Sequence, residues 1–141
     1  MKPAPKTTAG YSGTPLPRKL GIPEVGRAAV IDAPRGFLHL LGPWPKKLQK
    51  SPKLSGPLDY IHVFAVERRV LQTLFPKARD ALAKAGTLWI SWPKKASGRA
   101  TDITEDVVRE IGLDAGLVDV KVCAVDETWS GLKFMYRLKD R

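Results

Sequence analysis

Charged and aromatic side chains follow the apolar runs that we predict to be strands. The set contains four cations, three acids, two indoles and one hydroxyl, namely Arg35, Arg68, Lys94 and Lys95, Asp32, Asp126 and Glu127, Trp92 and Trp129, and Ser130. Guanidinium and ammonium groups bind anions, and an indole ring is a flat apolar surface on which planar groups stack. The set therefore predicts a binding site for an anionic ligand that carries a planar group.

Each of these side chains also has a purely structural interpretation. Trp92 precedes a proline at a strand end and suits core packing, and Lys94 and Lys95 suit a solvated loop. Trp129 lies between two acids and Ser130-Gly131 in a short connection. A large exposed aromatic in such a place either packs back onto the protein or binds something. The two interpretations stay open at this point.

The remaining reactive residue types do not form a recognisable motif. His62 lies within an apolar run, which predicts a core histidine, and His39 is distant from it. Cys123 stands between Val122 and Ala124, which predicts a buried, unreactive thiol. Two separated histidines and one cysteine lack the ligand spacing of a metal site. We therefore assign no metal, no cofactor and no catalytic residue.

The elements that must position these residues alternate between strand and helix. Strand-like runs cover residues 27–32, 60–66, 87–92, 117–125 and 132–138. Helical spacing predicts one helix from Val70 to Leu82 with Gly86 as its stop, and a second along the stripe Ile103, Val107, Ile111 and Ala115, begun by a capping box of Asp102 and Glu105. Residues 37–41 fit either helix or strand, and 42–57 reads as a proline-broken loop.

This order predicts an α/β fold. Strand, helix, strand, helix, strand favours a small doubly wound, mostly parallel, Rossmann-like sheet of about five strands that ends in an antiparallel C-terminal hairpin. In such sheets ligands bind beyond the carboxyl ends of the parallel strands. The four loops that carry the charged and aromatic side chains are therefore expected to meet along one edge.

Proline and charge divide the 141 residues unevenly. Ten of the twelve prolines fall within residues 1–57, so we predict a disordered leader over 1–10 and one α/β domain over 11–141, of which 11–57 is loop-rich and basic. Residues 1–53 hold ten Lys or Arg against two acids, whereas 54–141 hold fourteen against twelve. This excess favours an anionic partner, either a small molecule or a nucleic acid, although a solvated basic surface explains it equally well.

Composition also bears on the cellular compartment. The single cysteine cannot form an internal disulfide, and the charged first residues lead into no apolar signal stretch. No apolar run approaches the roughly 18 residues of a membrane helix. We expect a cytoplasmic protein that does not enter a membrane.

The chain order resembles that of the class I methyltransferases. Residues 20–27 leading into Ala28–Asp32 look like the approach to the methyltransferase glycine loop, and those enzymes also insert an antiparallel strand near the end. The resemblance stops at the cofactor motif. The turn reads Asp32-Ala33-Pro34-Arg35-Gly36, with one glycine and a proline that lacks an N–H, and no acid for ribose hydroxyls occurs between Asp32 and Asp59.

Three stretches resemble a second family, the bacterial domain-of-unknown-function family 3052. They are GYSGTPL at residues 10–16, LWISWPKK at 88–95 and VDVKVCAVDETWSGLKF at 118–134. The resemblance implies a bacterial cytoplasmic protein and carries over no activity and no catalytic residue.

Three functions follow in order of preference. The first is a non-enzymatic binding or regulatory module for an anionic ligand or acidic partner. The second is sequence-independent nucleic-acid binding through the basic first third. The third is an atypical transferase of methyltransferase-like fold.

Overall fold

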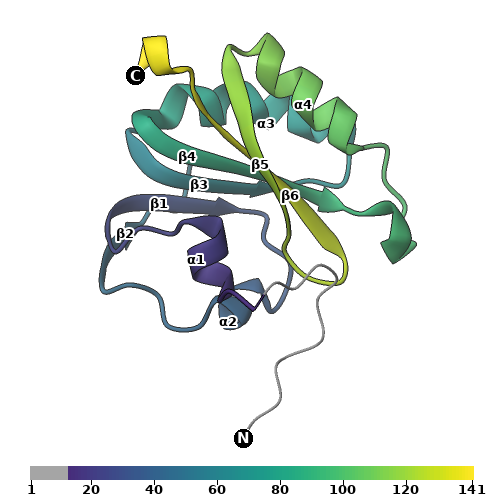
Figure 1. Cartoon of the computed structure of the whole chain (residues 1–141), viewed down its shortest axis with the longest axis horizontal. Helices are drawn as coiled ribbons and strands as arrows, with labels where there is room; N and C mark the ends of the chain where they lie inside the picture. The colour runs from purple at the N-terminus through teal and green to yellow at the C-terminus, as the bar shows by residue number, and fades with distance from the viewer. Residues whose placement is uncertain (1–12) are drawn as a thin grey trace, which may run out of the picture.

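The computed structural model describes residues 13–141, so the predicted leader over 1–10 lies outside the described residues. Six strands, four α-helices and two short 3-10 helices follow one another along the chain (Figure 1). In order they are α1 (Leu16–Leu20), β1 (Val25–Ile31), α2 (Phe37–Leu41), β2 (Lys47–Lys50), β3 (Leu58–Phe64), α3 (Arg68–Ala81), β4 (Leu82–Pro93), η1 (Lys95–Ser97), α4 (Glu105–Asp114), β5 (Leu117–Ala124), β6 (Trp129–Tyr136) and η2 (Leu138–Asp140).

All six strands join one sheet in the order β2-β1-β3-β4-β6-β5. Strands β2, β1, β3 and β4 run parallel, and β6 pairs antiparallel with both β4 and β5. The predicted α/β class and the antiparallel C-terminal hairpin are confirmed. The chain leaves β1 toward β2 on one side and leaves β3 toward β4 on the other, so the order reverses between β1 and β3.

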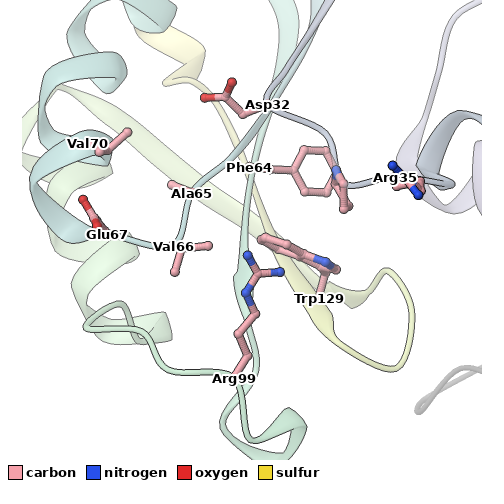
Figure 2. A pocket seen from close by; sticks show the side chains of 10 residues that line it. Asp32, Arg35, Phe64, Ala65, Val66, Glu67, Val70, Arg99 and Trp129 are labelled. Atoms are coloured by element: carbon pink, nitrogen blue, oxygen red, sulfur yellow. The ribbon is translucent and has the colours of Figure 1, made fainter.

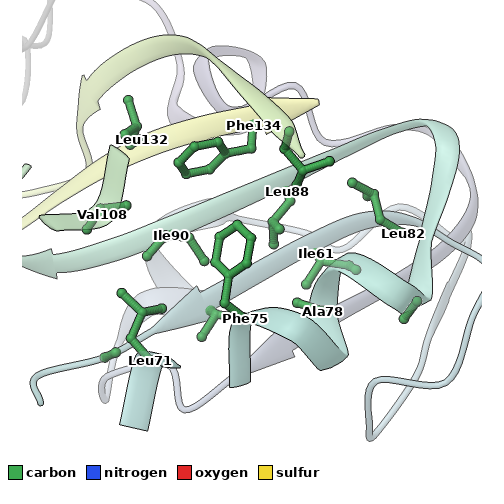
Figure 3. Packing of buried hydrophobic residues seen from close by; sticks show 14 of the residues in the cluster. Ile61, Leu71, Phe75, Ala78, Leu82, Leu88, Ile90, Val108, Leu132 and Phe134 are labelled. Atoms are coloured by element: carbon green, nitrogen blue, oxygen red, sulfur yellow. The ribbon is translucent and has the colours of Figure 1, made fainter. Parts of the chain in front are cut away.

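Helices cover both faces of the sheet (Figure 1). On one face, α3 and α4 pack Leu71, Phe75 and Val108 against apolar side chains of β3, β4 and β6 (Figure 3). On the other face, α1 and α2 contribute Leu20 and Phe37 to a second core. Strands β3 and β4 are buried by both layers, which explains their nearly continuous apolar sequence.

Several predicted boundaries are wrong for identifiable reasons. The sheet has six strands because β2 lies within the stretch that reads as a loop. It is an edge strand with only Leu48 buried, so it carries no apolar pattern. The ambiguous residues 37–41 form α2. Gly86 lies inside β4 instead of ending a helix, where a Cβ atom would stand 3.0 Å from the carbonyl oxygen of Leu58.

The capping of α4 also differs from the prediction. Thr104 is its N-cap, and the Thr104 hydroxyl accepts a hydrogen bond from the N–H of Val107 at 3.2 Å. The carboxylate of Asp102 instead accepts the N–H of Arg68, at 2.7 Å, and so caps the first turn of α3. Asp102 and Glu105 have the spacing of a capping box, but the carboxylate of Asp102 caps α3 instead of α4.

Candidate functional site

A hollow of about 460 Å³ opens where the strand order reverses (Figure 2). We call it the switch-point hollow. The loops that follow β1 and β3 form most of its wall, and its lining residues are Asp32, Pro34, Arg35, Phe64, Ala65, Val66, Glu67, Val70, Arg99 and Trp129. Doubly wound sheets bind ligands at this position because the crossovers diverge there and leave a crevice above the strand ends.

The wall of the hollow carries mixed charge. Asp32, directly after β1, and Glu67, directly before α3, are its acids, and Arg35 and Arg99 are its cations. The Glu67 carboxylate lies 3.8 Å from the guanidinium of Arg69, a pair exposed to solvent. Asp32 has a φ of 59°, which makes it the one non-glycine residue in the left-handed region among residues 13–141. Aspartate tolerates this region better than most residues, and such conformations concentrate at binding sites.

Two aromatic rings form the floor of the hollow. Phe64 and Trp129 meet edge to face with their ring centroids 5.3 Å apart. Trp129 is 5% exposed, so it packs back into the protein, yet it still faces the hollow. The carboxylate of Asp126 accepts the N–H groups of Thr128 and Trp129, at 2.8 Å each, and holds the turn that presents the indole.

Arg99 lies over this floor. Its guanidinium carbon is 5.3 Å from the centre of the Trp129 ring, within the range of a cation–π contact (Figure 2). Arg99 belongs to the loop of residues 94–104, which two side chains tie to the end of β3. The Thr101 hydroxyl donates to the carbonyl oxygen of Val66 and accepts the N–H of Ile103, while Asp102 caps α3. These bonds fix the loop that places Arg99 above Trp129.

A second hollow, of about 500 Å³, adjoins the first at the end of β4. We call it the β4 hollow. It is lined by Trp92, Pro93, Lys94, Lys95, Gly98, Arg99, Ala100, Thr101, Ile103, Thr104, Glu105 and Ser130. Arg99 lines both hollows and separates them.

Seven of the ten predicted site residues line one or the other of these hollows. Asp32, Arg35 and Trp129 line the switch-point hollow, whereas Trp92, Lys94, Lys95 and Ser130 line the β4 hollow. Arg68, Asp126 and Glu127 line neither hollow. Sequence reasoning missed Arg99, which lies in the loop after β4, and it did not select Glu67 for the site, although Glu67 directly follows the predicted strand of residues 60–66. The exposed lysines Lys46, Lys47 and Lys50 lie along the β2 edge, and nucleic-acid binding through them stays a prediction.

The residues after β1 and β2 do not fit S-adenosylmethionine in the usual methyltransferase mode. Pro34 has no N–H to offer, and of the turn residues only Gly36 is a glycine, with a φ of 90° at the start of α2. The end of β2, where a ribose carboxylate is expected, holds Lys50, Ser51 and Lys53. The N–H of Ser51 donates a hydrogen bond to the carbonyl oxygen of Ala28, at 2.7 Å. No acidic side chain is available there for ribose hydroxyls.

A buried polar chain joins β3 to β4 away from both hollows. The Tyr60 hydroxyl and the His62 Nδ1 are 3.1 Å apart, and the His62 Nε2 and the Ser91 hydroxyl are 2.7 Å apart. All three residues are fully buried. Burial lowers the pKa of His62 to about 3 and raises that of Tyr60, so both stay neutral. Although serine beside histidine suggests a nucleophile and base, no solvent reaches the pair, and His62 is the core histidine that was predicted.

Cys123 is likewise buried, at 5% exposed. Burial raises the pKa of its thiol, which disfavours the reactive thiolate. Within residues 13–141, no three His, Cys, Asp or Glu side chains come together as a metal-binding group. None of the helices in this part of the chain is both long and apolar enough to cross a membrane.

Solved structures of methyltransferases share this fold. An O-methyltransferase from neocarzinostatin biosynthesis, in complex with S-adenosylmethionine and a naphthoic acid, matches 80% of the chain at 11% identity and a TM-score of 0.58; the chain spans about half (49%) of that enzyme. Magnesium protoporphyrin IX methyltransferase from Synechocystis PCC 6803, with bound S-adenosylmethionine, matches 86% at 11% identity and a TM-score of 0.58, over 74% of its own length.

A ribosomal protein L11 methylase from Lactobacillus delbrueckii subsp. bulgaricus matches 86% of the chain and 75% of its own, at 14% identity and a TM-score of 0.56. No family profile and no curated protein matches the chain by sequence. At these identities the likeness establishes a Rossmann-like, methyltransferase-type fold and nothing finer.

Proposed function

We propose that this protein is an atypical transferase of methyltransferase-like fold that binds an anionic, ring-bearing ligand in the switch-point hollow. The position of that hollow, between β1 and β3 at the reversal of strand order, carries the proposal. The fold shared with methyltransferases favours a transferase over a binding module without activity.

Individual side chains suit such a ligand. Arg35 and Arg99 supply planar, permanently charged donors for a phosphate or carboxylate. Arg99, in cation–π contact with Trp129, offers a planar guanidinium on which a ring can stack, and the carboxylate of Asp32 can accept a hydrogen bond from a ligand hydroxyl or amino group. Since the loop after β1 lacks the glycines of a usual donor site, the ligand is held by side chains more than by backbone N–H groups.

One observation favours a second candidate, the non-enzymatic binding module. The two features that a methyltransferase uses for its donor, a glycine loop and a ribose acid, are replaced here by Pro34 and by Lys50-Ser51. A domain that kept the crevice but lost the donor site would still bind an anion without transferring a group. Both candidates require a ligand in the switch-point hollow and differ in whether that ligand is consumed.

Family and domain assignment belong to the same proposal. The three stretches at residues 10–16, 88–95 and 118–134 support membership of the bacterial domain-of-unknown-function family 3052. We also propose that residues 11–141 form one domain, because all six strands share a sheet, and that the protein acts in the cytoplasm.

The test is a ligand panel read by thermal stability and calorimetry. Nucleotides, coenzyme A and S-adenosyl compounds are screened against the unmodified chain, and a true ligand at about 100 times its Kd should stabilise the fold by about 2.7 kcal/mol. Arg35→Ala should weaken binding of the hit at least about tenfold, because one charge-assisted hydrogen bond contributes roughly 1.5–3 kcal/mol. Arg18→Ala, an exposed arginine on α1 outside both hollows, is the matched control.

Consumption of the hit separates the two candidates. The unmodified protein and Arg35→Ala are incubated with the ligand and a bacterial metabolite extract, and the ligand is followed by mass spectrometry. Loss of ligand only with the unmodified protein supports the transferase, whereas stable binding without loss supports the binding module. A panel in which no compound stabilises the chain would rule out both.

A further inference from the structure

Positive charge gathers in the β4 hollow without a counterion. Its lining contains three cations, Lys94, Lys95 and Arg99, and one acid, Glu105. The carboxylate of Glu105 is already paired with Arg109, at 2.6 Å. Within residues 13–141, none of the three cations forms an ion pair with an acidic side chain. The hollow therefore has an uncompensated charge.

The backbone that carries these lysines is held in place. The N–H of Lys94 donates to the carbonyl oxygen of Thr128 at 2.8 Å, which ties the end of β4 to the β5–β6 turn. The carbonyl oxygen of Lys94 accepts both the N–H of Ser97, at 3.0 Å, and the Ser97 hydroxyl, at 2.7 Å. The side chain of Lys94 is half-buried. An ammonium group in a hollow that is lined by two further cations is stabilised by an anion that enters the hollow.

The floor of the hollow is apolar. Trp92 and Ile103 are 4% and 2% exposed, and Pro93 lies beside them in the lining. Thr104 and Ser130 line the same hollow. The Thr104 hydroxyl accepts a hydrogen bond from the N–H of Val107. An apolar floor beneath a cationic rim suits an ester whose phosphate faces the lysines and whose body covers the indole.

We infer that the β4 hollow is a second binding site, for a phosphate-bearing compound, separate from the switch-point hollow and joined to it through Arg99. Lys94 and Lys95 bind the phosphate, and Trp92 with Ile103 supports the rest of the molecule. Because Arg99 lines both hollows, it contacts the ligands of both sites, which then lie side by side. This inference rests on the proposed function only for the role of the neighbouring ligand, since the charge of the β4 hollow stands by itself.

The chain supplies its own matched control. The tetrapeptide Trp-Pro-Lys-Lys occurs twice, at residues 92–95 in the β4 hollow and at residues 44–47, which run into the first residue of β2. The double variant Lys94→Ala/Lys95→Ala therefore removes the same charge from the same tetrapeptide as Lys46→Ala/Lys47→Ala. The two lysine pairs differ in their structural surroundings, and only the first lines the β4 hollow.

The experiment titrates inorganic pyrophosphate into the full chain by calorimetry, with 31P NMR as a second readout. Lys94→Ala/Lys95→Ala should lower the affinity at least about tenfold, since it removes two charged hydrogen-bond donors from the hollow. Lys46→Ala/Lys47→Ala should leave the affinity within about twofold, a change of roughly 0.4 kcal/mol. Thermal unfolding of each variant verifies that it is folded.

Two arginine variants separate this site from the site proposed in the switch-point hollow. Arg35 lines only the switch-point hollow, so Arg35→Ala should not change pyrophosphate binding, whereas Arg99→Ala should weaken it. Equal losses in both lysine pairs would indicate non-specific charge attraction and overturn the inference, as would no pyrophosphate binding at millimolar concentration. A loss with Arg35→Ala alone would place the anion in the other hollow, against the inference but in support of the proposed function.

Discussion

The two faces of the sheet are covered in different ways. On one face, α3 and α4, with 14 and 10 residues, cover a core of aliphatic residues, two phenylalanines and Trp92. On the other, α1 and α2 have five residues each, or about 7.5 Å of helix. The core beneath these short helices includes Tyr60 and Trp89 and surrounds the buried His62 and Ser91.

On the face covered by α1 and α2, hydrogen bonds contribute part of the stabilisation that helix packing contributes on the other face. The Trp89 indole N–H donates to the carbonyl oxygen of Leu20, at 2.7 Å, and so attaches the end of α1 to the sheet. The His62 ring stacks on Phe64 with centroids 4.3 Å apart, and Phe64 in turn meets Trp129 at the switch-point hollow. The face with the thinner cover is therefore specified in part by polar contacts, and it also supplies the floor of the candidate site.

The largest effect is expected on the face covered by α3 and α4, which we call the apolar face. Phe75 is fully buried and lies edge to face with Phe134, 5.5 Å between centroids (Figure 3). Phe75→Ala should lower the free energy of unfolding by about 3–5 kcal/mol, because it leaves a cavity that the rigid sheet cannot fill. Urea denaturation measures this, and Lys77→Ala on the exposed side of α3 is the control. A loss below about 1 kcal/mol would mean that the face is loosely packed.

The next largest effect is expected from Ser91→Ala, on the face covered by α1 and α2, which we call the polar face. This change removes the partner of the His62 Nε2 and leaves a buried ring nitrogen without a hydrogen bond. We expect a loss of about 1–3 kcal/mol in the free energy of unfolding. The exposed Ser55→Ala should change it by less than about 0.5 kcal/mol. If both serines behaved alike, the buried chain would have no part in specifying this face.

The polar face also predicts acid sensitivity. Folded His62 has a pKa of about 3, below the value near 6.5 of an unfolded histidine. Between these values the unfolded chain binds a proton that the folded chain does not, so stability falls as the pH falls, by about 1.4 kcal/mol per pH unit. His62→Gln should remove this slope, whereas the exposed His39→Gln should retain it. Denaturation curves from pH 7 to pH 4 measure the slope, and an unchanged slope in His62→Gln would contradict the assignment.

The smallest effect is expected at the rim of the apolar face, where Arg109 of α4 binds the carboxylates of Glu105, Asp106 and Asp119. These groups are partly exposed, so Arg109→Ala should lower the free energy of unfolding by only about 0.2–1 kcal/mol. The hydrogen bond from Arg109 lowers the pKa of Asp119, so this contribution is present above the unfolded pKa and is lost as the pH falls through the folded value.

Denaturation at pH 7 and near pH 2, each at low and high salt, checks this prediction. The difference between the unmodified chain and Arg109→Ala should shrink with acid and with salt. If the difference in the free energy of unfolding changed with neither acid nor salt, the variant would have lost packing of the arginine stem rather than charge.

Patterns in the sequence predicted the elements that both layers bury. Residues 61–64 and 88–92 form nearly continuous apolar runs, because both helix layers bury these strands. Strand β2 was not predicted, because only one of its residues is buried and its sequence therefore carries no apolar pattern. Backbone pairing with β1 holds this edge strand in the sheet. The carboxyl-end rule likewise predicted that the loops after β1, β3 and β4 lie at one edge of the sheet, since it depends only on strand order.

The fold class, the core strands and the loops that carry charge could be predicted from the sequence, because they depend on local pattern and connectivity. How those loops are grouped depends on the tertiary structure. It placed Arg35 and Lys94 in different hollows, gave Asp102 to α3 instead of α4, and set Arg99 over Trp129. Each of these depends on contacts between residues about 30 or more positions apart, and such contacts exist only once the sheet has formed.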